Sequence, residues 1–199
     1  MSGLVLPRVV LSQAAEDAVT VVNRTFAWFT TLSAPGPGSA QPESVVLPHL
    51  LAVGEEFTRE SLLECSERQV LPGLAIHESL WERGEREAEQ SWESVKASWK
   101  AWHGINFASF PQYEQHQGLV EARNAVVHGL GRLTRRQTRK DGGKGTKTKL
   151  KKAKIDVVGS SIVLKFDDVQ LARLVVIGLV EWLDGEMRAR GLWRAVGVP

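Results

Sequence analysis

SQAAEDAVTVVNRTFAWFTTL, residues 12–32, repeats apolar side chains every three or four positions. This period places them on one face of an α-helix, so the segment predicts an amphipathic helix with one buried stripe. The stripe consists of Ala15, Ala18, Val19, Val22, Phe26 and Phe29. Three prolines follow within residues 34–44, where the helix cannot continue and we expect a linker.

The helical period recurs along the rest of the chain. Further helices are predicted over residues 48–70, 74–102 and 112–136, and over a last segment that ends near Arg190. Asp167 or Asp168 can cap this last helix. Its expected buried residues are Leu171, Leu174, Val175, Leu179 and Trp182.

Two short runs, residues 154–158 and 162–166, alternate apolar and polar side chains around GSS and predict a β-hairpin. The predicted fold class is therefore mainly α: a helical bundle of about five helices with a small β-hairpin insertion before the last helix. A length of 199 residues suits a single domain over residues 1–199.

The composition narrows the class of protein. Apolar residues make up 43% of the chain and charged residues 24%, as in globular proteins. The single cysteine, Cys65, excludes an intrachain disulfide and is predicted to be a small buried residue. No segment reads as a signal peptide or is long enough to span a bilayer, so we expect a cytoplasmic protein without membrane contact.

The seven tryptophans are unusual beside a single tyrosine. Trp81, Trp92 and Trp99 lie near one face of the helix expected over residues 74–102. We interpret this face as packing, in the core or against a second subunit, rather than as a platform for stacking bases.

Positive charge is concentrated in one segment. Between Arg132 and Lys154 there are eleven Lys or Arg residues and one acid, Asp141, so this segment carries +10 while the whole chain carries +2. Like charges repel one another, and a polyanion such as RNA or DNA is the simplest reason to keep them together. The alternative is that the charges only keep a loop soluble. In structure, residues 137–154 are expected to form a flexible basic loop.

Several routes to catalysis are absent from the sequence. It has no Cys/His spacing typical of zinc, no GxxxxGK[ST] phosphate loop and no GxSxG nucleophile elbow. We therefore predict neither a metal site nor a cofactor.

The segment EARNAVVHGLGRLTRRQ, residues 121–137, combines side chains suited to chemistry on phosphate. Asn124 and His128 are one helical turn apart and can touch. Arg123 and His128 are separated by about 140° around a regular helix, so they converge only if the helix is distorted or a second chain supplies one of them. This geometry suggests a site at a two-fold dimer interface.

The RNAVVHG run resembles the signature of the HEPN superfamily, in which an Arg precedes a His by four to six residues and an Asn often follows the Arg. The resemblance covers residues 117–137 and is closest to HEPN-like ribonucleases of prokaryotic toxin–antitoxin and phage-defence systems. It implies an all-α bundle, a homodimer and metal-independent RNA cleavage. A cognate antitoxin or a larger defence complex is a further possible partner. The hairpin and the basic loop depart from a minimal bundle of this family.

The residues suit this reaction. His128 can act as general base or acid near neutral pH, and Arg123 can hold the scissile phosphate. Asn124 can orient the imidazole or hold a phosphate oxygen. We expect Arg132, Arg135, Arg136, Arg139 and Lys140 to bind the RNA backbone. His103 and His116 border the motif and are expected to face solvent, the alternative being that they line the cleft that holds the RNA. Glu121 is also expected to be solvated.

Three alternatives stay open. Arg123 and His128 can be ordinary structural residues. The chain can be a non-catalytic RNA-binding or dimeric scaffold module, or a DNA-binding regulator, although no recognition-helix motif supports the last.

Overall fold

The computed structural model describes residues 11–32, 42–69, 75–139 and 141–192, and within these ranges it is mainly helical. The helices are α1 (Gln13–Leu32), α2 (Pro42–Glu67), α3 (Ala75–Glu89), α4 (Trp92–His103), α5 (Tyr113–Gly129), α6 (Arg135–Arg139), α7 (Lys144–Lys152) and α8 (Phe166–Ala189). The antiparallel strands β1 (Asp156–Val158) and β2 (Ser161–Val163) form a hairpin just before α8. The predicted fold class is confirmed.

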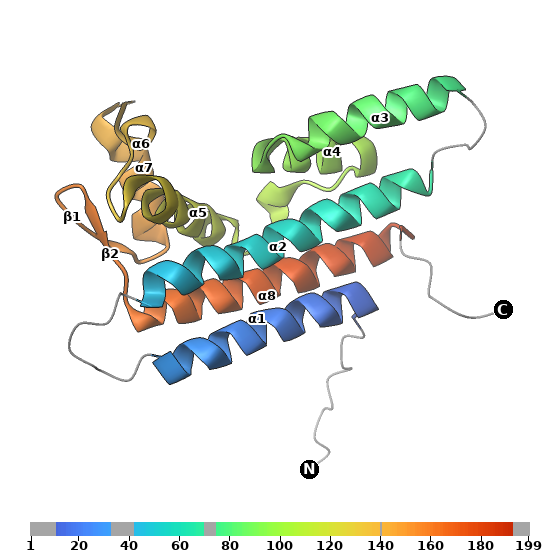
Figure 1. Ribbon diagram of the computed structural model, residues 1–199. Helices are drawn as coiled ribbons and strands as arrows, with labels where there is room; N and C mark the ends of the chain where they lie inside the picture. Colours follow the sequence, from blue (N-terminus) through green and yellow to red (C-terminus); the bar gives the residue numbers. More distant parts are fainter. Residues whose placement is uncertain (1–10, 33–41, 70–74, 140, 193–199) are drawn as a thin grey trace, which may run out of the picture.

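Three long helices, α1, α2 and α8, lie side by side and form the main layer of the molecule (Figure 1). Their facing stripes are apolar, and the stripe predicted for α1 is buried at Ala15, Ala18, Val22 and Phe29. Gly54 lets α2 approach α8 closely, because a Cβ there would lie 3.1 Å from Val176. Cys65 is buried against Met187, and burial raises the pKa of its thiol to about 11, as expected for an inert core residue.

The helix α5 lies nearly end-on in the view in which the three long helices run across the page (Figure 1). It packs against α2 and α8 on one side and against α7 on the other. Gly118 allows the α5–α7 contact, because a Cβ at this position would clash with the carbonyl of Lys149 and lie 2.6 Å from the Cβ of Ala153. Such an approach is possible only for glycine.

The boundaries predicted around residues 34–102 need two corrections. The helix α2 begins at Pro42, six residues before the predicted start, because proline is tolerated in a first helical turn; residues 34–41 of the expected linker lie outside the described residues. The helix predicted over 74–102 is two helices. The first, α3, ends at Glu89, and Ser91 then caps α4 by accepting from the N–H of Ser94 at 3.1 Å.

Two further corrections concern the basic region. The helix predicted over 112–136 ends at Gly129, because Leu130 and Gly131 are both left-handed and the Gly131 N–H donates to the Ala125 carbonyl at 3.0 Å. The loop predicted to be flexible over 137–154 contains α6 and α7. Burial of Leu150 and Ala153 offsets the charge repulsion there.

Of the residues predicted to be buried on the last helix, Val175 and Leu179 are buried, Leu171 and Trp182 are half-buried and Leu174 is exposed. The N-cap of α8 is Lys165 rather than an aspartate, and Asp168, the third residue of the helix, accepts from the Lys165 N–H at 2.8 Å as in a capping box. Within the described ranges, no helix is both long and apolar enough to cross a bilayer.

Candidate functional site

His128 lies in the last turn of α5, with its side chain exposed. The chain then turns through Leu130 (φ 50°) and Gly131 (φ 83°) and pairs with the hairpin, where the Leu133 N–H donates to the Ser160 carbonyl at 2.8 Å. Val127 and Leu130 beside it are also exposed, Leu130 by 93%. His128 thus stands at the surface, at a helix end fixed by backbone hydrogen bonds and flanked by apolar side chains.

Arg123 instead points into the monomer, toward α2. Its Nη1 donates to Oε2 of Glu55 at 2.8 Å, and both side chains are about four-fifths buried. Nε of Arg123 and Oε1 of Glu55 are buried without a hydrogen-bond partner among the described residues. Such unsatisfied atoms are uncommon in folded proteins, because leaving a buried polar group unpaired costs free energy.

His116 extends this buried polar cluster, defined here as Glu55, His116 and Arg123. It lies seven residues before Arg123 and therefore on the same face of α5. Its ring is 2% exposed, and its Nε2 also lacks a partner among the described residues. Burial, followed by the charges of Lys96 and Arg123, lowers the pKa of His116 to about 4. His116 is therefore neutral at pH 7.

Lys96 of α4 lies near this cluster and contacts two aromatic rings. Its side chain is 9% exposed, and its Nζ lies 5.8 Å from the Trp92 ring centroid and 5.5 Å from that of Tyr113. Its Nζ also pairs with the exposed Glu93 at 2.9 Å. Ring contacts and one carboxylate thus hold an ammonium group near His116.

The structure brings only part of the predicted catalytic set together. Asn124 is half-buried, and no hydrogen bond joins it to His128 within the described part of the chain. Arg123 and His128 do not contact one another by a hydrogen bond either. In a single chain the arginine is directed inward and the histidine outward, as the spacing of five residues predicts for a regular helix.

The predicted RNA-binding arginines lie on the turn after α5 and on α6. Arg132, Arg135, Arg136 and Arg139 are exposed, and none pairs with an acid in the described ranges, while Lys140 lies outside them. Gln137 joins α6 to α5, since its Nε2 donates to the Glu121 carbonyl at 2.9 Å and to its carboxylate at 2.8 Å. Glu121 is therefore not solvated, contrary to expectation.

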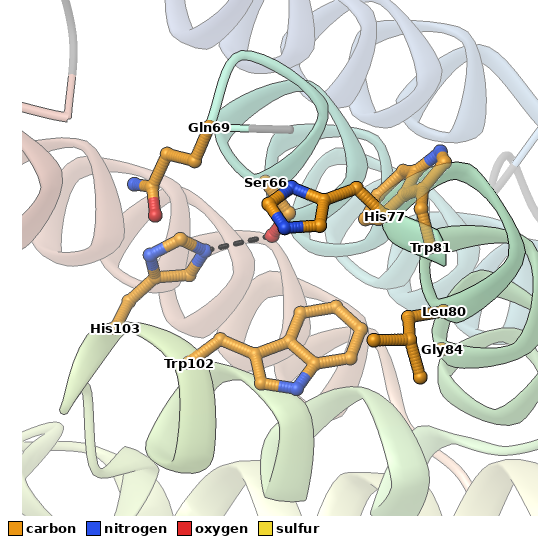
Figure 2. A pocket seen from close by; sticks show the side chains of 8 residues that line it. All are labelled: Ser66, Gln69, His77, Leu80, Trp81, Gly84, Trp102 and His103. Carbon is orange, nitrogen blue, oxygen red and sulfur yellow. Dashed lines mark hydrogen bonds between the residues drawn. The ribbon is translucent and has the colours of Figure 1, made fainter. Parts of the chain in front are cut away.

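A hollow lies between α3 and the ends of α2 and α4, away from the motif (Figure 2). It measures about 370 Å3 and is lined by Ser66, Gln69, His77, Leu80, Trp81, Gly84, Trp102 and His103. His103 is half-buried and hydrogen-bonds Ser66 at 2.8 Å, and burial lowers its pKa. The expectation of solvent exposure was wrong for both His103 and His116. His103 belongs to this aromatic hollow, whereas His116 lies beside Arg123.

Sequence reasoning missed Glu55 and Lys96. Glu55 lies one turn after Leu51 on the helix that buries Leu47, Leu51 and Thr58. A carboxylate next to such an apolar stripe needs a cation, and this position could have been noticed in the sequence. Lys96 belongs to the α4 face that buries Val95 and Trp99, but the sequence does not identify the rings that surround it.

Within the described residues, no group of three or more His, Cys, Asp or Glu side chains could hold a metal ion. No protein-family model, curated protein or solved structure matches this chain.

Proposed function

We propose that the protein is a metal-independent endoribonuclease that acts as a homodimer, with Arg123, Asn124 and His128 in the active site. The observation that carries this proposal is the setting of His128: an exposed imidazole at a fixed helix end, followed by four arginines without acidic partners in the described ranges. A basic surface beside a general base is what cleavage of a polyanion requires.

The reaction needs no group beyond the protein and its substrate. A base takes the proton of the RNA 2′-OH, the 2′-oxygen forms a bond to the adjacent phosphorus, and the bond from phosphorus to the 5′-oxygen breaks. The leaving 5′-oxygen takes a proton from the acid, giving a 2′,3′-cyclic phosphate and a 5′-OH. His128 serves in proton transfer, and Arg123 offsets charge on the phosphate oxygens with the donors that Glu55 does not use.

A second copy of the chain would bring together the arginine and the histidine that a single chain holds apart. Val127 and Leu130 flank His128 as exposed apolar side chains, and Leu130 has φ 50°, a conformation that disfavours leucine. An interface that buries Leu130 would give a reason for this arrangement. Across a two-fold axis, His128 of one copy can then approach α5 of the other, where Arg123 must turn away from Glu55 to meet it.

One observation favours the alternative, a non-catalytic RNA-binding module. The Arg123–Glu55 ion pair is internal to the monomer and joins α5 to α2, as a structural pair would. In that case the basic surface binds RNA, while the arginine only stabilises the fold. A role in toxin–antitoxin or phage-defence systems, within the cytoplasm, rests on the HEPN resemblance and is part of the same proposal.

The test is cleavage of total RNA in excess EDTA by the wild type, His128→Ala and Arg123→Lys. Arg123→Lys keeps a charge beside Glu55, so the fold survives while paired donation to phosphate is lost. We expect His128→Ala to slow cleavage by at least about 100-fold, as removal of a general acid or base does. His49→Ala, which changes an exposed side chain on α2, is the matched control and should cut normally.

Products with 2′,3′-cyclic phosphate and 5′-OH ends, identified by mass spectrometry, complete the expected result. If the wild type binds RNA without cutting it, or if cutting survives both substitutions, the non-catalytic module is the correct description.

A further inference from the structure

A hollow of about 450 Å3 lies where the end of α7 meets β1, and lysines dominate its lining. It is lined by Lys147, Lys151, Lys154, Ile155, Asp156 and Val157. The Asp156 carboxylate is paired with Lys165, and none of the three lining lysines pairs with an acid in the described ranges. Three ammonium groups around one hollow repel each other unless an anion joins them.

The lysines of α7 divide into two sets by direction. Lys149 pairs with Glu121 at 3.0 Å, and Lys152 pairs with Glu114, so both face α5. Lys147 and Lys151 are four residues apart and share another face of α7. Lys154 follows two residues after the helix end and lines the same hollow, and all three lysines are exposed. One set of lysines therefore attaches the helix to the fold, and the other lines the hollow.

Lys154 carries an independent sign of function in its backbone. Its φ is 57°, in the left-handed region that glycine or asparagine adopts at lower cost. Its N–H donates to the Lys151 carbonyl at 3.0 Å, so the turn itself uses only main-chain atoms. A glycine would satisfy this turn better, which indicates that the lysine side chain has a use of its own.

The helix dipole does not explain this set of lysines. Cations stabilise the last turn of a helix, which accounts for Lys151 and Lys152. Lys147, however, is the fourth residue of α7, near the end where the dipole disfavours positive charge. The dipole therefore gives no reason for Lys147 to line the hollow beside Lys151 and Lys154, whereas an external anion would.

We propose that Lys147, Lys151 and Lys154 bind the sugar-phosphate backbone of a nucleic-acid strand. That this strand is RNA rests on the proposed function. The hairpin connects the hollow to the catalytic end of α5, because Arg132 pairs with Ser161 of β2. Lysines bind phosphates as point charges and do not read the 2′-OH or the bases. A DNA strand of the same sequence should therefore occupy this site and compete with RNA without being cut.

The test measures binding of a fluorescent single-stranded RNA by anisotropy in EDTA, with His128→Ala as the common background to prevent cleavage. The site variant carries Lys147→Gln, Lys151→Gln and Lys154→Gln. Its matched control carries Arg24→Gln, Arg86→Gln and Lys100→Gln, which remove the same charge from exposed positions on α1, α3 and α4. A fourth protein carries Lys154→Gly, which removes one charge and keeps the left-handed backbone of the turn.

We expect the site variant to bind at least tenfold more weakly and the control variant to lose less than twofold. The slope of log K against log salt should fall by about 2 in the site variant, for three lost phosphate contacts to a single strand. Lys154→Gly should bind more weakly and melt no lower than its parent. Inorganic phosphate at the same ionic strength should compete no better than chloride.

Equal weakening of the two triple variants, or of neither, would overturn the proposal, and so would strong competition by inorganic phosphate, which would identify a small-anion site. The binding test is separate from cleavage. If the site variant loses RNA binding and the wild type does not cleave RNA, this site is supported and the nuclease is refuted. If the wild type cleaves RNA and the site variant binds RNA normally, the nuclease is supported and this site is refuted.

Discussion

Three buried polar atoms without partners in the described chain, one each on Glu55, His116 and Arg123, gather around the arginine of the motif. Buried polar groups in folded proteins are nearly always hydrogen-bonded, so such a concentration is informative. Two of the three residues come from α5 and one from α2. The cluster therefore lies on the contact that holds the motif helix against the main layer.

The burial of His116 predicts a pH-dependent stability. Its pKa is about 4 in the folded protein, against an ordinary value of 6.5. Between these values the unfolded chain takes up a proton that the folded chain does not, so the free energy of unfolding falls as the pH falls from 6.5 towards 4. Urea unfolding of the wild type should show this contribution as a loss of about 2 kcal/mol between pH 7 and pH 5.

The variant His116→Gln isolates this contribution, because glutamine does not titrate. Its fall in stability between pH 7 and pH 5 should be smaller than that of the wild type by the same amount. His49→Gln, on the exposed surface of α2, should keep the full fall. If His116→Gln and the wild type lose stability in parallel, His116 is not buried as described.

At the scale of elements, the contact of α5 with α7 determines whether the basic region is ordered. Gly118 permits close approach of the two helices, and acids on α5 pair with Lys149 and Lys152 on α7. A lysine-rich segment that would repel itself in isolation is thereby attached to a surface of opposite charge.

Gly118→Ala should destabilise the protein by about 1 to 3 kcal/mol, the usual cost of overpacking a well-packed contact. The added Cβ would press on the backbone of α7, which cannot rotate away as a side chain can. Gly185→Ala on α8 is the matched control, since nothing lies within 4 Å of its Cβ. There, alanine should stabilise the helix by about 1 kcal/mol. Urea unfolding that moved both variants in the same direction would contradict the described α5–α7 packing.

The sequence predicted those elements whose signal is local. The apolar period of residues 12–32 and the alternation around the GSS turn specified α1 and the hairpin, and an aspartate marked the start of α8. The helix over residues 144–152 is held by acids on α5. These acids lie outside the basic segment, so its own sequence does not predict the helix. The end of α5 was only partly predictable, because the left-handed cap is Leu130 and the glycine that favours this conformation, Gly131, follows one residue later.

At the scale of the whole molecule, the spacing of the motif predicted how its side chains are directed but not what surrounds them. The spacing of Arg123 and His128 correctly indicated that a regular helix would separate them, and the structure directs one inward and the other outward. Glu55, from α2, joins the arginine only through tertiary packing. The pairing of the hairpin with the end of α5 likewise depends on chain segments about 30 residues apart.

The most direct test of a site shared between two copies is the activity of a mixed dimer. Arg123→Lys and His128→Ala chains, carrying different affinity tags, are co-expressed, and the heterodimer is purified through both tags. Each parent homodimer should be inactive on RNA in EDTA. The heterodimer should recover about half of the wild-type rate, because one of its two sites combines an intact arginine with an intact histidine. A heterodimer as inactive as its parents, beside an active wild type, would contradict the shared site.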